Sequence, residues 1–209
     1  MTSGHDQQAE AGDDALRAFA RRNEPMTALA EQADAVAEAC HAMAVRFHRG
    51  GKLVVFGTGA SSTDAQHVAV EFVHPVIVGK RALPAISLTT DIATVTGRAE
   101  REGMDAIFSH QLRYLAAPSD IALGICATGD CRSVLAGLAA ARQIGMLTIA
   151  LAGGGGAIAA GPAADHVLLA RSDDPRVVKE IHVTMYHLLW ELVHVFFEQP
   201  GALSPGVFA

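Results

Sequence analysis

Residues 52–62 read KLVVFGTGASS and predict a buried strand, a tight glycine turn and the start of a helix. The apolar run is short enough for a strand, and two glycines follow it within three residues. Five strand candidates of this kind alternate with helical stretches along the chain: 52–56, 85–88, 120–126, 147–151 and 166–169. This alternation is typical of an α/β fold in which helices cover both faces of a parallel sheet.

Helical patterns flank this core. A stripe with the spacing of one helix face indicates a helix over about 15–48, interrupted near Pro25; its members are Met26, Leu29, Ala33, Val36, Cys40, Met43 and Phe47. Residues 62–73, 106–116, 133–144 and 175–197 predict further helices. We therefore predict a disordered tail at 1–14, a single domain with an N-terminal helical extension at 15–199, and a C-terminal tail at 200–209.

Composition excludes several classes of protein. Half of the 209 residues are hydrophobic and 18% are charged, which argues against disorder. Every long apolar stretch is interrupted, and the polar start resembles neither a secretory signal nor a transit peptide. The net charge of −6 and the lack of a basic run argue against direct nucleic-acid binding. Three cysteines do not make a disulfide framework, so we expect a cytoplasmic protein with no membrane partner.

Two loops are candidates for ligand binding, because open α/β sheets bind ligands beyond the carboxyl ends of their strands. Residues 57–62 and 126–131 each join a predicted strand to a predicted helix, where free backbone N–H groups attract anions. Taken alone, each loop is more simply explained as an ordinary tight strand–helix turn. The first loop is neither a Walker loop nor a full dinucleotide fingerprint, since Ser62 stands at the third glycine position.

Histidines and glutamates on two helices suggest acid–base chemistry or a metal site. His67 and Glu71 are four residues apart, and His187, Glu191 and His194 share a face of the closing helix. A Glu and a His from two helices can transfer a proton between them. The same residue types bind zinc. Each histidine taken alone is more simply explained as a solvated or hydrogen-bonded helix residue.

The stretch from Gly57 to Glu71, GTGASSTDAQHVAVE, resembles the signature of the sugar isomerase (SIS) family in its phosphoheptose isomerase branch. That branch reads Gly-Asn-Gly-Gly-Ser, two variable residues, Asp-Ala-Gln-His and a Glu four residues after the His. Further matches follow in family order at 83–91, 120–125, 139–146 and 180–187. The resemblance covers most of the chain from about residue 25 to 195.

The resemblance implies a three-layer α/β sandwich with a five-stranded parallel sheet, assembled as a homotetramer with sites between subunits. It implies an aldose–ketose isomerase that interconverts sedoheptulose 7-phosphate and an aldoheptose phosphate through an enediol. Glu71 and His187 match the catalytic pair. His67, Glu71 and His187 match three positions that hold zinc in some members. The candidate substrate-binding residues are Thr58, Gly59, Ser61, Ser62, Thr89, Thr90, Asp91, Thr128, Asp130 and Lys179.

Several positions depart from the family pattern. The family's phosphate loop reads Ser-Thr-Ser-Gly-Asn-Ser, whereas residues 126–131 read CATGDC and keep one hydroxyl. Asp130 adds a negative charge that repels a phosphate. Pro75 replaces an Arg, and Lys179 replaces the Gln that supplies the fourth zinc ligand; a protonated Lys has no lone pair for a metal. Thr96–Glu100 replaces a Gly-Asn-Asp segment.

These departures leave alternatives open. The altered phosphate loop also suits a non-catalytic SIS protein that binds a sugar phosphate or a protein partner, as the member that binds the bacterial replication initiator does. A third hypothesis is a metal-binding role in which His74, His182 or a loop cysteine joins the three shared residues. The retained pair, Glu71 and His187, favours the isomerase, with a substrate other than heptose phosphate left open.

Overall fold

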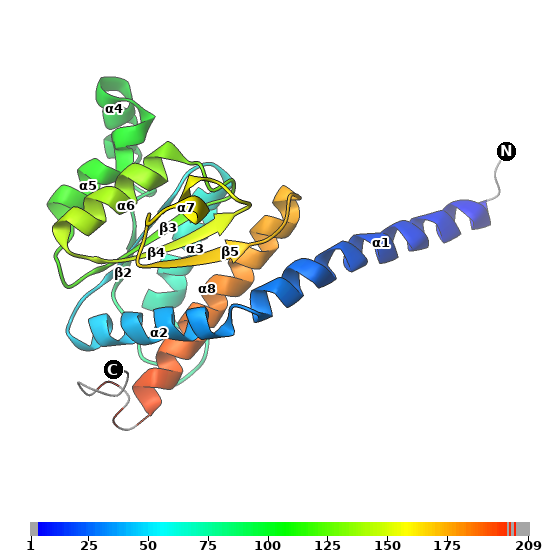
Figure 1. Ribbon diagram of the computed structural model, residues 1–209, viewed down its shortest axis with the longest axis horizontal. Helices are drawn as coiled ribbons and strands as arrows, with labels where there is room; N and C mark the ends of the chain where they lie inside the picture. Colours follow the sequence, from blue (N-terminus) through cyan, green and yellow to red (C-terminus); the bar gives the residue numbers. More distant parts are fainter. Residues whose placement is uncertain (1–3, 200, 202, 204–209) are drawn as a thin grey trace.

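The computed structural model describes residues 4–199, 201 and 203, and a five-stranded sheet forms its centre (Figure 1). The strands are β1 (Leu53–Gly57), β2 (Ala85–Ser87), β3 (Ile121–Cys126), β4 (Leu147–Gly153) and β5 (His166–Ala170). They lie in the order β2-β1-β3-β4-β5, and each pairing is parallel. The predicted α/β fold with a five-stranded parallel sheet is confirmed.

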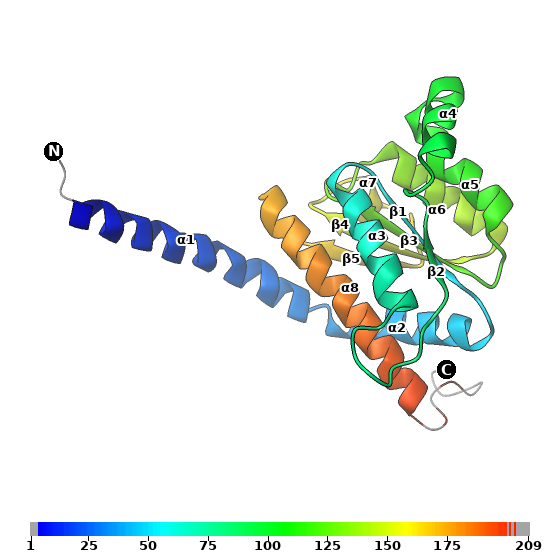
Figure 2. The ribbon, with the colours of Figure 1, turned by 180° about the vertical axis from the view of Figure 1, so that it is seen from behind.

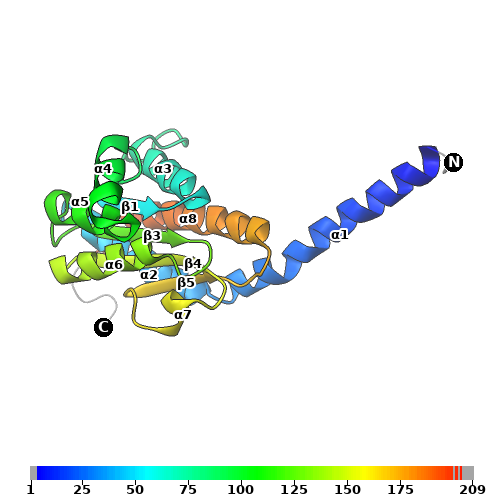
Figure 3. The same ribbon diagram turned by 90° about the horizontal axis from the view of Figure 1, so that it is seen from above.

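Helices form a layer on each face of the sheet. On one face lie α2 (Ala33–His48), α3 (Ala60–Val73) and α8 (Pro175–Glu198) (Figure 2). On the other lie α5 (Ile107–Leu115) and α6 (Arg132–Ile144) (Figure 3). The other elements after the first strand are α4 (Ile92–Glu102), a 3₁₀ turn (Met104–Ala106) and α7 (Ala157–Ala160).

Strand β1, which lies between β2 and β3, shows why this sequence builds two cores. Leu53 and Val55 pack in the cluster under α2, α3 and α8, whereas Val54 and Phe56 pack in the cluster under α5 and α6. All four side chains are fully buried. Alternate residues of a strand point to opposite faces, so a strand covered on both faces must be apolar throughout. The continuous apolar run in the sequence follows from this two-sided burial.

The N-terminal helix α1 (Gly4–Ala30) begins earlier than the sequence predicted. The predicted tail at 1–14 is therefore wrong for the residues from Gly4 onward, which are rich in the helix formers Ala, Glu and Gln. The interruption predicted near Pro25 is also wrong, because the helix continues through Pro25 and turns only at Glu31–Gln32. The helix projects away from the sheet (Figures 1 and 3).

Two side chains fix the junction between this helix and the rest of the fold. The Gln32 amide donates to the carbonyl of Leu169 at 2.9 Å and accepts its N–H at 2.9 Å, so it occupies the open edge of β5. The Arg22 guanidinium binds the Glu180 carboxylate of α8 through two bonds of 2.6 and 2.7 Å. These contacts attach the C-terminal part of α1 to the rest of the fold, while its N-terminal part projects away from the sheet (Figure 1).

Two further predictions concern the C-terminal end of the chain and membrane-spanning segments. The C-terminal tail predicted at 200–209 lies outside the described residues, apart from residues 201 and 203. Among the helices that the structure describes, none has the length and apolarity needed to cross a membrane.

Candidate active site

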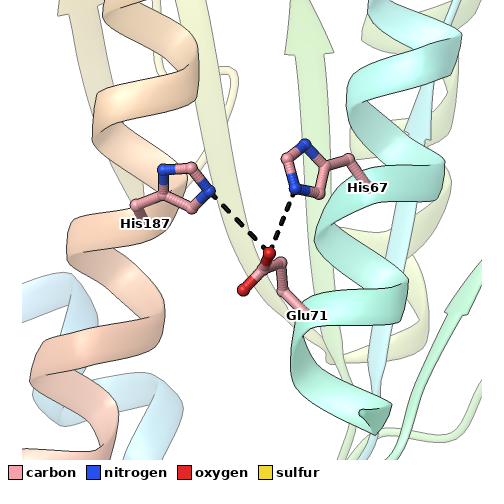
Figure 4. A group of neighbouring side chains, drawn as sticks. All are labelled: His67, Glu71 and His187. Carbon is pink, nitrogen blue, oxygen red and sulfur yellow. Dashed lines mark hydrogen bonds and ion pairs between the residues drawn. The ribbon is translucent and has the colours of Figure 1, made fainter. Parts of the chain in front are cut away.

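Two neighbouring helices bring His67, Glu71 and His187 together. His67 and Glu71 are one turn apart on α3, and His187 faces them from α8 (Figure 4). The Oε1 atom of Glu71 lies 3.1 Å from His67 Nε2 and 4.0 Å from His187 Nε2. One ligand atom from each residue falls within 4.8 Å of the other two. The carboxylate is therefore shared between two imidazole rings from different helices.

The three side chains of this group differ in how far they are exposed to solvent. The Glu71 side chain is 13% exposed, whereas those of His67 and His187 are 43% and 47% exposed. A mostly buried carboxylate with a histidine on each side can accept a proton while a hydrogen bond from one ring keeps the carboxylate in place. Two imidazoles and a carboxylate are also a donor set that zinc accepts.

Tyr186 contacts His67 at the ring nitrogen that does not face Glu71. Its hydroxyl lies 3.0 Å from His67 Nδ1, while Nε2 of the same ring faces Glu71. Burial raises the pKa of Tyr186, with the negative charges of Asp64 and Glu71 adding to the effect, so the side chain stays a neutral phenol. A hydrogen bond at one ring nitrogen fixes the orientation of the ring and the tautomer that the other nitrogen presents. Sequence reasoning missed this residue, whose apolar neighbours made it look like core.

A cavity of about 730 Å³ opens beside the group between α3, α8 and the segment after α3. Its lining residues are His67, Glu71, Val76, Ile77, Lys80, His187, Trp190, Glu191 and Val195. The wall opposite the polar group is mostly apolar. A small polar molecule that enters this cavity reaches the Glu71 carboxylate directly.

The first predicted loop, 57–62, forms a tight turn that is stabilised by a hydrogen bond within the loop. Gly59 has a φ of +58°, the left-handed region that glycine adopts most readily, and it precedes α3. The Ser62 hydroxyl donates to the Gly59 carbonyl at 2.7 Å, and Ser61 is buried. Gly59 is exposed, and Thr58 and Ser62 are partly exposed. The structure thus places both serines in the turn that starts the helix.

The second loop, 126–131, lies beside the first because β1 and β3 are neighbours in the sheet. Thr128 is exposed, and its hydroxyl lies 3.8 Å from the sulfur atoms of both Cys126 and Cys131. The Asp130 carboxylate accepts the N–H of Ala157 at 2.7 Å, at the start of α7. Asp130 therefore has a structural partner within the chain. None of the loop residues lines the cavity beside Glu71.

The candidates after β2 are likewise engaged in local structure. The Thr89 hydroxyl lies 2.7 Å from that of Ser87, and the Thr90 hydroxyl donates to the Ser87 carbonyl at 3.1 Å. Asp91 caps α4 by accepting the Thr94 N–H at 3.2 Å. A hydrogen bond from the Thr94 side chain, followed by the one from its backbone, lowers the pKa of Asp91. These residues follow the carboxyl end of β2, and Asp91 acts as a helix cap.

Lys179 joins α8 to the start of α3. Its Nζ lies 2.7 Å from Asp64 Oδ1, 2.9 Å from the Ala60 carbonyl and 3.0 Å from the Thr63 hydroxyl. Asp64 is buried, so the ammonium group is its counter-charge. Each of the three hydrogens on Nζ has an acceptor. Asp64 is a second residue that sequence reasoning missed, although it lies in the Asp-Ala-Gln-His motif.

The remaining histidines do not join the site. His194, predicted to share a helix face with His187 and Glu191, does not line the cavity; it is buried and bonds the carbonyls of Trp190 and Arg81 at 2.8 and 2.9 Å. Glu191 lines the cavity. His182 is fully buried, and His74 ends α3; neither belongs to the metal-competent group found among the described residues.

Comparison with known proteins identifies the family. Residues 19–153 match the model of the SIS domain family. The chain belongs to this family. It is 43% identical over 176 residues to a phosphoheptose isomerase of Solidesulfovibrio magneticus, with 84% of this chain and 85% of that protein covered. A phosphoheptose isomerase of Desulfovibrio desulfuricans is 41% identical over 184 residues, which cover 88% of this chain and 87% of the relative.

Solved structures agree with the sequence relatives. The structure of a phosphoheptose isomerase from Francisella tularensis superposes with a TM-score of 0.82 at 31% identity, covering 88% of this chain and 98% of that one. The phosphoheptose isomerase from Neisseria gonorrhoeae gives a TM-score of 0.79 at 27% identity, with 88% and 98% covered. The predicted membership of the SIS family, close to its phosphoheptose isomerases, is confirmed.

Proposed function

We propose that the protein is an aldose–ketose isomerase that acts on a phosphorylated sugar, with sedoheptulose 7-phosphate as the first substrate to test. The observation that carries this proposal is the Glu71 carboxylate held between His67 and His187 at the mouth of a cavity. Glu71 and His187 are also the residues that match the catalytic pair of the family. The similarity to phosphoheptose isomerases over most of the chain supports the choice of substrate class.

The geometry suggests how the two residues divide the work. Glu71 takes the proton from C1 or C2 of the open-chain sugar and returns it to the neighbouring carbon, and an enediol forms between the two steps. His187, 4.0 Å away, moves the proton between the two sugar oxygens. His67 bonds the Glu71 carboxylate at 3.1 Å and keeps it aimed at the carbon. No atom is gained or lost overall.

Proton exchange in deuterated water tests this proposal. Wild-type protein incubated with sedoheptulose 7-phosphate should incorporate deuterium at C1 or C2, and Glu71→Gln and His187→Ala should each slow exchange by about 10²–10⁴-fold. Glu38→Gln on α2 and His110→Ala on α5 are matched controls outside the cavity. A folded wild-type protein that exchanges no proton with this or other sugar phosphates would overturn the proposal and favour a binding protein instead.

We infer further that His67, Glu71 and His187 can hold a zinc ion. Their ligand atoms lie within 4.8 Å of one another, and both residue types are ordinary zinc ligands. A bound zinc ion would supply Lewis-acid polarisation of a sugar oxygen. After incubation with zinc and removal of excess metal, one equivalent should remain on wild type and be lost from His67→Ala, while His110→Ala retains it. Equal zinc content in both variants would contradict this site.

We also propose that the protein is a homo-oligomer, with a tetramer as the expected form. The support is the exposure of large apolar side chains on α1, where Leu16 and Phe19 are 68% and 70% exposed at helical spacing. Exposed apolar side chains on a projecting helix favour contact with a second copy. Light scattering should give a mass near four chains, and Phe19→Glu should lower it; a monomeric wild type would refute this.

We propose that the protein is located in the cytoplasm. Its three cysteines are free thiols, which a reducing compartment maintains. Fractionation of cells that express the native chain should place it with cytoplasmic markers, and recovery in a secreted fraction would refute the assignment.

A further inference from the structure

The loop 126–131 places two cysteines in direct contact. Cys126 ends β3 and Cys131 precedes α6, and the N–H of Cys131 donates to the sulfur of Cys126 at 3.1 Å. The Thr128 hydroxyl lies 3.8 Å from each of the two sulfur atoms. Cys126 is buried, whereas Cys131 is partly exposed. Cys131 is therefore the member of the pair that solvent reaches, and Cys126 is covered by the surrounding protein.

The two thiols share a proton. A hydrogen bond with the Cys131 side chain lowers the pKa of Cys126 to about 6, and the Cys131 N–H and the Thr128 hydroxyl add to this effect against the opposing cost of burial. The same contact raises the pKa of Cys131. At neutral pH the pair thus carries one proton and one negative charge. A thiolate is the form of cysteine that reacts with oxidants.

The third cysteine has none of these features. Cys40 lies on α2 in the core, and its nearest polar partner is the Leu189 carbonyl at 4.0 Å. Burial raises its pKa to about 12. Cys40 is therefore the internal control for a buried thiol without a thiol partner.

The backbone of the loop is fixed, so only the side chains are free to move. Gly129 has a φ of +78°, and a Cβ there would lie 2.9 Å from the Gly153 carbonyl oxygen. The Gly129 carbonyl accepts the N–H of Ile158 at 3.0 Å, and Asp130 accepts that of Ala157. The sulfur atoms can approach each other by side-chain rotation while these bonds persist.

We propose that Cys126 and Cys131 are a redox-active pair that a hydroperoxide converts into a disulfide within the loop. The Cys126 thiolate takes the proton of Cys131 as the partly exposed sulfur of Cys131 attacks the hydroperoxide; an S–O bond forms, the O–O bond breaks, and the released oxygen takes a proton from solvent and leaves as water or an alcohol. The sulfur of Cys126 then attacks Cys131, so that the S–S bond forms and the S–O bond breaks, releasing water. Overall two thiols and one hydroperoxide give one disulfide, one water and one water or alcohol.

The pair lies in the loop that matches the family's phosphate loop, so its oxidation should change how the loop binds an anion. This step rests on the proposed function. The reduced loop carries a thiolate, which repels a phosphate and accepts the Thr128 hydroxyl. A disulfide is uncharged and frees that hydroxyl for another acceptor. Loss of one repulsive charge at close range should tighten binding of inorganic phosphate about fivefold at neutral pH.

Peptide mapping tests the bond without reference to catalysis. Trypsin cleavage after Arg113 and Arg132 leaves both cysteines in the peptide 114–132, whereas Cys40 falls in the peptide 23–46. After one equivalent of hydrogen peroxide, the peptide 114–132 should lose the mass of two hydrogens and resist alkylation, and a dithiol should reverse both changes. Cys131→Ser and Cys126→Ala should each abolish the change, while Cys40→Ala should retain it.

The results that would overturn the proposal are equally distinct. Stable sulfinic acid on Cys131, or no reaction at peroxide levels that spare the methionines, would refute the disulfide. Calorimetric titration with inorganic phosphate should show tighter binding by the oxidised than by the reduced wild type. Equal or weaker binding would refute the effect on the loop, and this result does not depend on isomerase activity.

Discussion

Acid should destabilise this fold through one buried histidine, His182. The side chain is fully buried on α8, and its ring nitrogens make no hydrogen bond within 3.5 Å to the described residues. Burial lowers the pKa of His182 from 6.5 to about 4, against weaker opposing effects of the Ala152 backbone and of Asp64. In the unfolded chain the ring takes up a proton near pH 6.5.

The sign and size of the effect follow from this difference. Because the folded pKa is the lower one, the contribution to stability is complete above pH 6.5 and is lost as the pH falls towards 4. A difference of about 2.5 pKa units corresponds to about 3 kcal/mol of unfolding free energy. Other acid-sensitive groups contribute equally to wild type and to a variant without this histidine.

Urea unfolding of wild type and His182→Gln between pH 7 and pH 4 measures the effect. The variant is expected to be less stable at pH 7, because glutamine packs less well in this site. Its deficit should then shrink by about 3 kcal/mol at pH 4, since it has no ring to protonate. His48→Gln, a change at an exposed position of α2, is the matched control. Parallel stability curves for wild type and His182→Gln across this range would refute the reasoning.

Three further substitutions have defined expectations. Lys179→Met removes the counter-charge of the buried Asp64 and should lower the unfolding free energy by about 3 kcal/mol, which urea titration measures and which a loss under 1 kcal/mol would contradict. Tyr186→Phe removes the hydrogen bond to His67 and should cost about 1 kcal/mol of stability and about tenfold in kcat, so unchanged kinetics would argue against a positioning role. Gly129→Ala forces a side chain into a left-handed, crowded position and should cost about 1–3 kcal/mol by thermal unfolding; a neutral result would show that the loop can move.

Hydrophobic pattern predicted the sheet but not every helix. Strands β1 and β3 are apolar and buried on both faces, so runs such as Leu53–Phe56 were recognisable. Helix α4 (Ile92–Glu102) was missed because it packs on the core only through partly buried residues such as Val95 and Ala99, so its apolar stripe is short. The first turns of α1 (GHDQQAE) are mostly polar, so they offer no apolar stripe from which to predict a helix.

The candidate site was predictable only in part. The spacing of His67 and Glu71 placed them on one helix face, and the family resemblance supplied His187 as their partner. Helical spacing does not reveal what lies opposite a face, and so His194 was grouped with His187 although it does not line the cavity. Contacts between distant segments, such as Lys179 with Asp64, have no local signature.

The Lys179 ion pair also bears on the metal chemistry of the site. Its ammonium stands where the family resemblance expects the fourth zinc ligand, and its three hydrogens are already bound to acceptors on α3. Three protein ligands therefore remain, which is the number that catalytic zinc sites use while a position stays open for water or substrate. Structural zinc sites instead close with four. For the proposed zinc site, lysine in place of glutamine would leave one ligand fewer while keeping the proposed pair, Glu71 and His187, and its ion pair with Asp64 joins α8 to α3.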